Sequence, residues 1–306
     1  MARRHRIEGS TVFITGAARG IGAATAQRLH ARGANVALVG LEPELLERRA
    51  SELGERALWY EADVTDLEAL KGAVEATVER FGGIDVAIAN AGIHTIGSLA
   101  SAPVEAVERT LEVNLMGVWR TDRAVLPELA RSRGYLLNIA SLAAVAHAPL
   151  MGPYAASKAG VEALTDALRQ ELRPTGVRVG CAYFGFIDTD LVRASFAHPS
   201  TQVAQGSMPE FVRRPVPLSV AVDALERGVE RRSARVWAPR YVGWALALRG
   251  IVQPLAELRT VRDPRLAEAL RLADPATGAL EQQDPLLGIS PAAARERGAE
   301  HEKTST

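Results

Sequence analysis

Short apolar runs rich in β-branched residues alternate along the chain with longer stretches in which apolar and polar positions repeat at helical spacing. The short runs predict strands buried on both faces, and the longer stretches predict helices with one apolar side. Strands are expected at residues 11–14, 35–39, 57–60, 84–88, 135–139, 177–183 and 234–238. Helices are expected at residues 23–32, 44–53, 67–81, 104–129, 154–172, 220–231 and 266–272. Strands and helices that alternate in this way are typical of an α/β protein with a parallel sheet.

Another apolar stretch follows the last expected strand, at residues 241–252, with Arg249 inside it. Three interpretations stay open: a helix packed on the mouth of a substrate pocket, a subunit contact, or an interfacial membrane helix. We favour the first two. The chain is thus divided into a catalytic domain at 8–239, an apolar helical extension at 240–273, and a loosely ordered tail at 274–306 that is rich in Ala, Gly, Glu and Gln.

Composition narrows the classes of partner and compartment. Lysine plus arginine and aspartate plus glutamate both number 36, which gives no electrostatic case for nucleic acid as a partner. Cys181 is the only cysteine, so no internal disulfide is expected, and the basic start at residues 3–6 is not followed by the apolar run of a secretory signal. No run of about 18 apolar residues predicts a membrane-spanning helix. We therefore expect a cytoplasmic protein without a bound metal.

Glycines crowd the turn between the first expected strand and the first expected helix. Gly16, Gly20 and Gly22 give the spacing Gly-x-x-x-Gly-x-Gly within residues 15–22. Glycines let backbone N–H groups approach a ligand, and the N-terminus of a helix favours negative charge. The turn therefore predicts a phosphate site of a dinucleotide. The alternative is a tight turn that binds nothing.

The residues near the end of the second expected strand bear on the choice of dinucleotide. An acid at this place binds the ribose 2′-hydroxyl, whereas a nearby basic group suits a 2′-phosphate. The strand ends in Gly40 and Leu41 without a carboxylate, although Glu42 is close. Arg19 in the glycine turn could reach a 2′-phosphate, or it is a solvated loop arginine. The sequence leans to NADP over NAD, with Glu42 as the counter-argument.

Polar and small residues follow the next strands. Asp63 comes after the third strand, where it would accept a hydrogen bond from an adenine amino group or cap the following helix. Residues 90–92 end the fourth strand, and His94 after them is expected to be a loop residue. Asn114 lies inside a helix, where it is either solvated or turned inward to position water or a side chain. Ser141 follows the fifth strand, at the edge of a parallel sheet where ligands bind.

Tyr154 and Lys158 lie four residues apart at the start of the next expected helix, so their side chains project from one face. An ammonium close to a phenol favours the phenolate and lowers the pKa of the tyrosine. The two residues are therefore a candidate proton-transfer pair. Taken alone, the same spacing also describes an aromatic residue beside a solvated lysine.

The motifs together, in this order and at these spacings, resemble the short-chain dehydrogenase/reductase (SDR) family over about residues 8–239. The residues that carry the resemblance are Thr15, Gly16, Gly20, Gly22, Asp63, Asn90, Ala91, Gly92, Asn114, Ser141, Tyr154 and Lys158. The resemblance implies a Rossmann-like doubly wound parallel sheet in a single domain with a helical C-terminal extension. It also implies an NAD(P)-dependent oxidoreductase that transfers a hydride between nicotinamide and a secondary alcohol or ketone.

The resemblance further implies roles for individual residues. Tyr154 would be the general acid/base, Lys158 would lower its pKa and hold the nicotinamide ribose, Ser141 would orient the substrate oxygen, and Asn114 would hold a water linked to Lys158. The expected cofactor contacts are Gly16, Arg19, Gly20, Ile21, Gly22, Asp63, Val64, Asn90, Ala91, Gly92, Tyr154, Lys158, Ile187 and Thr189. Family members often pair through the helix that carries the tyrosine, so a homodimer or homotetramer is expected.

One departure from the family concerns the substrate side. The family usually has Pro-Gly after the sixth strand, where this chain has Phe184 and Gly185. The ring of Phe184 is expected to reach the nicotinamide or the substrate, and His147 is a second candidate substrate contact. Because the neighbouring pocket candidates are mostly apolar, we expect a bulky hydrophobic alcohol or ketone. Two alternatives are a dinucleotide-binding regulatory or scaffold protein without turnover, and a peripheral membrane protein.

Overall fold

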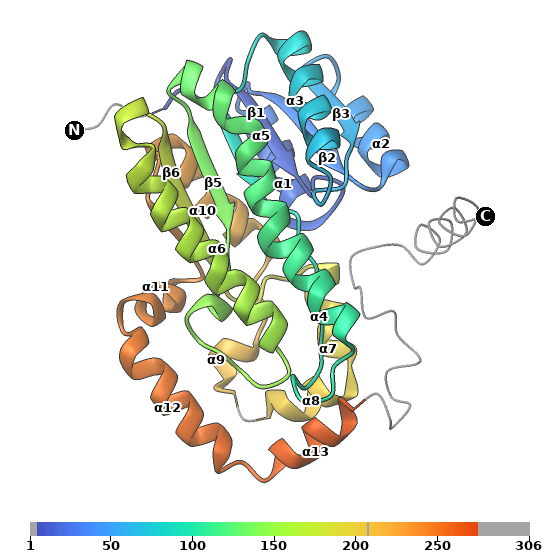
Figure 1. The fold of residues 1–306 in the computed structure, drawn as a ribbon, viewed down its shortest axis with the longest axis vertical. Helices are drawn as coiled ribbons and strands as arrows, with labels where there is room; N and C mark the ends of the chain where they lie inside the picture. Colours follow the sequence, from blue (N-terminus) through green and yellow to red (C-terminus); the bar gives the residue numbers. More distant parts are fainter. Residues whose placement is uncertain (1–4, 207, 275–306) are drawn as a thin grey trace.

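A seven-stranded parallel sheet forms the centre of the protein in a computed structural model that describes residues 5–206 and 208–274 (Figure 1). The strands are β1 (Thr11–Thr15), β2 (Asn35–Gly40), β3 (Ala57–Glu61), β4 (Val86–Ala89), β5 (Tyr135–Ile139), β6 (Arg178–Phe184) and β7 (Arg235–Ala238). Their order across the sheet is β3-β2-β1-β4-β5-β6-β7. The first strands are thus added on one side of β1 and the later ones on its other side, so the order of strands reverses between β1 and β4. The expected doubly wound α/β fold is confirmed, and the predicted strands differ from the observed ones only at their ends.

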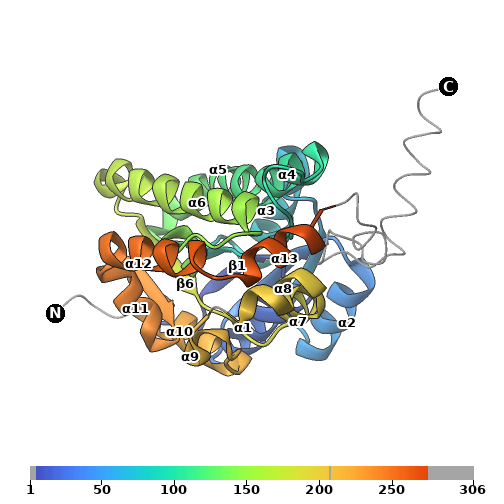
Figure 2. The same cartoon turned by 90° about the horizontal axis from the view of Figure 1, so that it is seen from below.

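Helices cover both faces of this sheet, as Figure 2 shows from below. On one face lie α1 (Gly20–Ala31), α2 (Pro43–Leu53) and α10 (Leu218–Arg231); on the other lie α3 (Leu67–Phe81), α5 (Gly117–Ser132) and α6 (Gly152–Glu171). Residues of β1 alternate between the two layers: Val12 and Ile14 pack with α1, whereas Phe13 packs with α3. Because helices cover both faces of the sheet, successive residues of a strand are all buried, and this explains the continuous apolar runs in the sequence.

The segments beyond the carboxyl ends of the strands form the lower half of Figure 1. They comprise α4 (Val104–Leu111), α7 (Asp190–Ala197), α8 (Pro199–Gln205), α9 (Glu210–Arg213), α11 (Arg240–Ala247), α12 (Arg249–Val261) and α13 (Arg265–Leu272). Helix α11 packs on β7 and contributes Val242 and Leu246 to the core, while Ala269 and Ala273 at α13 pack with α8. The sequence left the region of α7 to α9 without predicted elements.

Several expected boundaries are wrong for physical reasons. The single helix expected at 104–129 is interrupted by a π-helical turn, η1 (Glu112–Met116), and continues through Pro127 to Ser132. The helix with Tyr154 begins at Gly152, with Pro153 in its first turn, where the missing N–H of proline has no cost. The apolar stretch at 241–252 is two helices, α11 and α12, that meet at Leu248. From residue 275 on, the expected tail lies outside the described residues.

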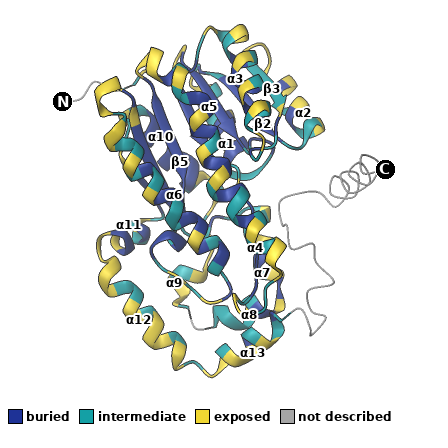
Figure 3. Cartoon of the chain, in the orientation of Figure 1, coloured by how far each residue is buried: buried dark blue, intermediate teal, exposed yellow. Residues whose placement is uncertain are grey.

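Burial separates inner from outer helix faces across the whole described chain (Figure 3). Of the extension, α11 has buried residues, but α12 has none. Among residues 5–206 and 208–274, no helix combines the length and apolar character needed to cross a membrane. For residues 241–252, the structure shows that α11 packs on β7 and the core, whereas the outer side of α12 has no partner within the described chain.

A buried carboxyl group, that of Asp122, lies between helix α5 and strand β5. Asp122 of α5 is 1% exposed, and its Oδ2 accepts a hydrogen bond of 2.8 Å from Asn138 Nδ2. Its Oδ1 has no hydrogen-bond partner among the described residues. Burial raises the pKa of Asp122 to about 8, and the bond from Asn138 only partly opposes this. The folded protein therefore favours the neutral acid.

We predict that Asp122→Asn removes a pH-dependent loss of stability. An unfolded aspartate releases its proton near its ordinary pKa of 3.8, whereas the folded protein retains it up to about pH 8. Between these values the unfolded state binds fewer protons, so the free energy of unfolding of the wild type falls as pH rises, by up to about 1.4 kcal/mol per pH unit. Urea unfolding at several pH values measures this slope. The variant should lose it, whereas Glu52→Gln, at an exposed carboxylate of α2, should keep it.

Candidate functional site

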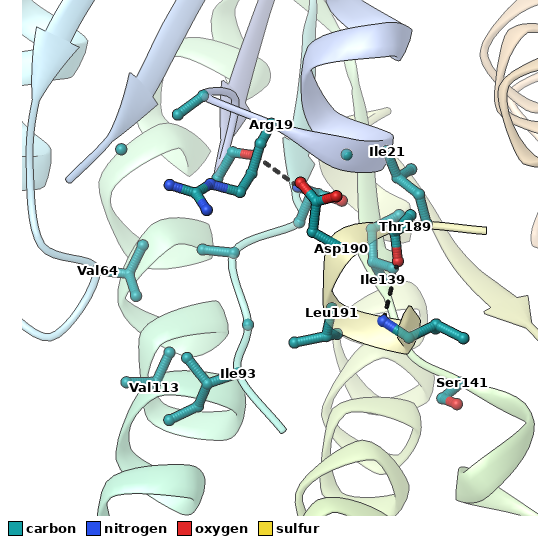
Figure 4. Close-up of a pocket in the computed structure, with 18 of the residues that line it drawn as sticks. Arg19, Ile21, Val64, Ile93, Val113, Ile139, Ser141, Thr189, Asp190 and Leu191 are labelled. Atoms are coloured by element: carbon teal, nitrogen blue, oxygen red, sulfur yellow. Dashed lines mark hydrogen bonds between the residues drawn. The ribbon is translucent and has the colours of Figure 1, made fainter. Parts of the chain in front are cut away.

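A cavity of about 760 Å³ lies at the carboxyl ends of the central strands, where the chain reverses its direction across the sheet. Figure 4 shows the glycine turn with Arg19 and Ile21 on one side, and Thr189, Asp190 and Leu191 facing it from the segment after β6. The predicted site residues that line this cavity are Gly16, Arg19, Gly20, Ile21, Asp63, Val64, Asn90, Ala91, Gly92, Ser141, Tyr154, Lys158, Phe184, Ile187 and Thr189. Gly22 and Asn114 stand behind this lining. The structure therefore gathers nearly the whole expected set in one place.

The glycine turn is built by close approach of the chain to itself. Gly16 has φ +63°, and a Cβ on it would lie 2.8 Å from Ala91 Cα, so only glycine fits there. A Cβ on Gly22 would collide with Gly16 O. The side chain of Asn90 fixes the turn: its Nδ2 donates to Thr15 O at 3.0 Å and to Gly16 O at 3.1 Å. Asn90 thus holds the backbone of the turn in place.

Arg19 and Glu42 form an ion pair at the edge of this cavity. The distance between Arg19 Nη2 and Glu42 Oε1 is 2.8 Å, and the two side chains are 35% and 15% exposed. From the sequence, Arg19 and Glu42 are two separate candidates, but in the structure a carboxylate from the loop after β2 holds the arginine, so a role of Arg19 toward a 2′-phosphate stays a prediction. Both groups that bear on the dinucleotide lie in the lining, and each offsets the charge of the other.

Asp63 is anchored where it can face a ligand. Its Oδ1 accepts from Thr65 N at 2.9 Å, and its Oδ2 pairs with Arg109 at 3.3 Å. Burial acts to raise the pKa of Asp63, but the bonds from Thr65 and the charge of Arg109 outweigh it and hold the pKa below its usual range. Asp63 does not cap the next helix; Asp66 does, by accepting from the backbone N–H groups at the start of α3. The cap part of the prediction was wrong by three residues.

Tyr154 and Lys158 lie on one face of α6, one turn apart, as expected. Lys158 is 4% exposed, its Nζ donates to Ile139 O at 2.9 Å, and it lies 5.7 Å from the centre of the Tyr154 ring. A Cβ on Gly92 would come within 3.5 Å of Lys158 Nζ and 3.1 Å of Asn114 Oδ1. The small residue at the end of β4 therefore leaves room for the ammonium at the cavity wall.

The pKa values of this pair differ from the expectation. Enclosure by the protein raises the pKa of the Tyr154 phenol, and a hydrogen bond with Ser141 opposes the rise. Burial lowers the pKa of Lys158 to about 8. The lysine was expected to lower the pKa of the phenol, but desolvation of both groups is the larger effect here. With a pKa of about 8, Lys158 is still mostly charged at pH 7 and loses its charge at a lower pH than an exposed lysine does.

Ser141 lies between the phenol and the end of β6. Its Oγ accepts from Ala143 N at 3.1 Å and donates a long bond of 3.4 Å to Phe184 O. Phe184 is 5% exposed and lines this cavity as well as a second one beside it. The hydroxyl of Ser141 is thus held at the junction of the two cavities, next to Tyr154.

Asn114 lies in the π-helical turn and is fully buried. Its Oδ1 accepts from Ile93 N at 2.8 Å, and its Nδ2 donates to Ile93 O at 2.9 Å and to Ser157 Oγ at 3.2 Å. The side chain thus pairs with a backbone segment as a neighbouring strand would. Of the two readings of this asparagine, the inward one is confirmed, and its contacts position the loop after β4.

His94 lies in the loop after β4, as expected, but sequence reasoning missed its burial beside Tyr154. It is 6% exposed, and its ring lies edge-on to Tyr154, with 4.8 Å between ring centres. Burial lowers the pKa of His94 to about 4, so it is neutral at pH 7, and its Nε2 has no hydrogen-bond partner among the described residues. Its position just after the small residues at the end of β4 was the available signal.

The second cavity, of about 890 Å³, adjoins the first at Ser141 and Tyr154. His94 and His147 belong to its lining, and most of the other lining residues are apolar. His147 is exposed, and its backbone N–H donates to Gln253 Oε1 of α12 at 2.7 Å. The predicted substrate contacts Ser141, Tyr154, Phe184 and His147 therefore all border this cavity.

Comparison with known proteins gives a consistent result. A family model described as short chain dehydrogenase matches residues 10–200. A trans-4-hydroxycyclohexanecarboxylate dehydrogenase from Sinomonas cyclohexanicum is 37% identical over 199 residues, which is 61% of this chain and 75% of the relative. Oxidoreductase UcpA from Escherichia coli strain K12 is 32% identical over 228 residues, 73% of this chain and 86% of the relative. An uncharacterized oxidoreductase from Thermotoga maritima is 36% identical over 187 residues, 60% and 73% of the two chains.

We predict that Asn114→Ala lowers the free energy of unfolding by about 2 kcal/mol or more, because it leaves a buried N–H and a buried carbonyl of Ile93 without partners. Urea unfolding measures this loss. The control is Asn35→Ala, which removes one long contact of 3.5 Å to Thr11 and should cost less than about 1 kcal/mol. Equal losses in the two variants would show that the contacts of Asn114 do not stabilise the fold.

Proposed function

Because this chain belongs to the short-chain dehydrogenase family, we propose that it is an oxidoreductase that transfers a hydride between a nicotinamide dinucleotide and a secondary alcohol or ketone. The observation that carries this proposal is the position of Ser141 and Tyr154 at the junction of two cavities, with Lys158 beside them in the first cavity. One cavity has a glycine-rich wall suited to phosphates, and the other is largely apolar. A dinucleotide and an organic substrate would thus meet at these three side chains.

The residues of the first cavity fit a dinucleotide. The glycine turn offers backbone close to the N-terminus of α1, and Gly16 and Gly92 stand where a side chain would intrude on their neighbours. When bound, the nicotinamide supplies or accepts the hydride. Lys158 would hold ribose hydroxyls with its Nζ, and Asp63 would accept from the adenine. Asn90 would act through the turn that it fixes.

The protein's own residues would handle the proton. The Tyr154 phenol would give its proton to the carbonyl oxygen, or take one from the alcohol, while Ser141 Oγ holds that oxygen in place. Lys158 beside the phenol would stabilise the phenolate as long as the lysine amine is protonated. Since the pKa of Lys158 is lowered to about 8, this support would weaken above that pH. The proposed reduction is therefore favoured at neutral pH or below.

The second cavity supports a bulky hydrophobic substrate. Its volume of about 890 Å³ and its mostly apolar lining suit a ring system or a branched chain. The relative from Sinomonas cyclohexanicum is by its name a dehydrogenase of a hydroxylated cyclohexane carboxylate. A cyclic secondary alcohol is accordingly the first substrate class to test here. The neutral Nε2 of His94 could contact a polar group of such a molecule.

A dinucleotide-binding scaffold without turnover is the second candidate. It would need the first cavity, with Lys158 as a ribose contact, but not the hydroxyl of Ser141 beside the phenol of Tyr154. Ser141 and Tyr154 also border the second cavity, where a protein that only binds a dinucleotide has no chemical use for a hydroxyl paired with a phenol. We therefore propose the enzyme, with a cytoplasmic location and a homodimer or homotetramer as continuing predictions.

We predict that Tyr154→Phe abolishes turnover and leaves dinucleotide affinity within about twofold, because only the transferred proton is lost. Turnover with cyclic ketones and fluorescence titration with NADPH and NADH measure the two effects. The matched control is Tyr135→Phe, which removes another buried hydroxyl, bonded to Ser233 O at 2.7 Å and distant from the cavities. Retained turnover in Tyr154→Phe would contradict the assigned role.

We also propose that the Arg19–Glu42 pair sets the choice between NADP and NAD. A 2′-phosphate would have to share Arg19 with a carboxylate, whereas a ribose 2′-hydroxyl could donate to Glu42. Glu42→Gln should therefore raise the NADPH to NADH affinity ratio by about tenfold, and Arg19→Ala should lower it. Fluorescence titration measures both ratios. Arg49→Ala, which removes a nearby guanidinium that binds Ala18 O, is the control. Equal changes for both dinucleotides would refute the switch.

A further inference from the structure

The outer side of the C-terminal extension carries a concentration of exposed apolar side chains, here called the α11–α12 face. It consists of Trp244, Leu248, Ile251, Leu255, Leu258 and Val261, which are between 47% and 77% exposed. Within α12, Ile251, Leu255 and Leu258 follow one another at helical spacing and so form a single stripe. Large apolar side chains that are scattered singly need no explanation, but six within 18 residues do.

The opposite side of α12 is fixed to the catalytic body. Arg249 pairs with both carboxylate oxygens of Glu162 on α6, at 2.7 and 3.1 Å, and Gln253 binds the backbone of His147. Positions 249 and 253 lie one turn apart, on the side of the helix away from the stripe. The orientation of α12 is therefore determined by polar contacts on its inner side. The stripe is turned outward by these contacts; helix α12 itself runs along the lower left edge of Figure 1.

The face also surrounds the opening of the second cavity. Trp244, Leu248 and Leu255 line that cavity and are at the same time 70%, 47% and 61% exposed, so they stand at its mouth. Phe211, 62% exposed, lines the cavity too and lies edge-on to Tyr241 at 5.5 Å. The inner end of the cavity is Tyr154. An apolar route thus leads from the exposed face to the catalytic phenol.

The charges around the face are positive. Arg240 and Arg262 are exposed, and neither forms an ion pair with another residue in the described part of the chain. The acid on α12, Glu257, accepts a hydrogen bond from Gln253 and keeps its charge, but it is the one acid within residues 240–262, which hold four arginines. A second copy placed symmetrically on this face would bring arginines toward arginines and would cover the mouth of the cavity. A surface of anionic headgroups is complementary to the same arginines.

We propose that the α11–α12 face docks the protein on the surface of an anionic phospholipid bilayer, with the apolar stripe in the headgroup region and the cavity mouth open to the lipid. Trp244 suits this depth, because indole rings favour the interface between lipid and water. Apolar area and basic charge together are what interfacial helices use to bind. The part of the proposal in which substrate enters from the lipid rests on the proposed function; the docking itself does not.

Vesicle co-sedimentation of the full chain tests the docking. The protein should pellet with vesicles of phosphatidylcholine and phosphatidylglycerol, and less with phosphatidylcholine alone. Ile251→Ser with Val261→Ser should lower the bound fraction by about tenfold or more, because both residues are exposed and neither lines the cavity. The matched control is Leu99→Ser with Val104→Ser, two exposed apolar residues away from the face, which should bind as the wild type does.

Several outcomes would overturn the proposal. They are absence of pelleting with either vesicle, and equal pelleting of the Ile251→Ser, Val261→Ser variant and the wild type. Self-association that the same variant abolishes, without vesicle binding, would assign the face to a second copy. Pelleting only after removal of residues 275–306 would assign it to the chain's own tail. Because pelleting needs no turnover, Tyr154→Phe should bind vesicles like the wild type, and a failure of docking would leave the oxidoreductase proposal intact.

Discussion

The site depends first on the contact between the ends of β1 and β4. There the side chain of Asn90 donates to two successive carbonyls of the glycine turn, and its backbone N–H donates to Thr15 Oγ1 at 3.0 Å. This contact stands where the strand order reverses, so the loops on its two sides diverge and leave a cavity between them. This contact fixes both the glycine turn and the wall of the cavity that admits Lys158.

The fold could be predicted because its signals are local. Strands such as β1 are apolar throughout, since parallel strands are buried on both faces, and the glycine turn marks the first switch from strand to helix. Tyr154, Lys158 and Ser141 were found because each follows a strand end or lies one helical turn from its partner. The π-helical turn at Asn114 could not be found in this way, because its local sequence keeps the helical pattern and the partner of Asn114, Ile93, is 21 residues away.

Electrostatic properties of the site were predicted less well, because they depend on enclosure and on residues distant in sequence. Arg19 and Glu42 are 23 positions apart and meet only after β2 is laid beside β1. The sequence indicated that Lys158 would lower the pKa of Tyr154, but burial raises the pKa of Tyr154 and lowers the pKa of Lys158. The role of His94 likewise depends on a ring contact with Tyr154 that no spacing encodes.

Helix α6 connects Tyr154 and Lys158 with the outer surface. Tyr154, Lys158 and Glu162 follow each other at intervals of four residues, so they form one stripe along the helix. The first two face the cavities, while Glu162 accepts from Tyr183 at 2.9 Å and from Arg249 of α12. Glu162 is 7% exposed and thus has few partners other than these. Helix α6 therefore carries both the phenol of Tyr154 and the carboxylate that binds α12, so the place of α12 at the cavity mouth is set from the same helix that positions Tyr154.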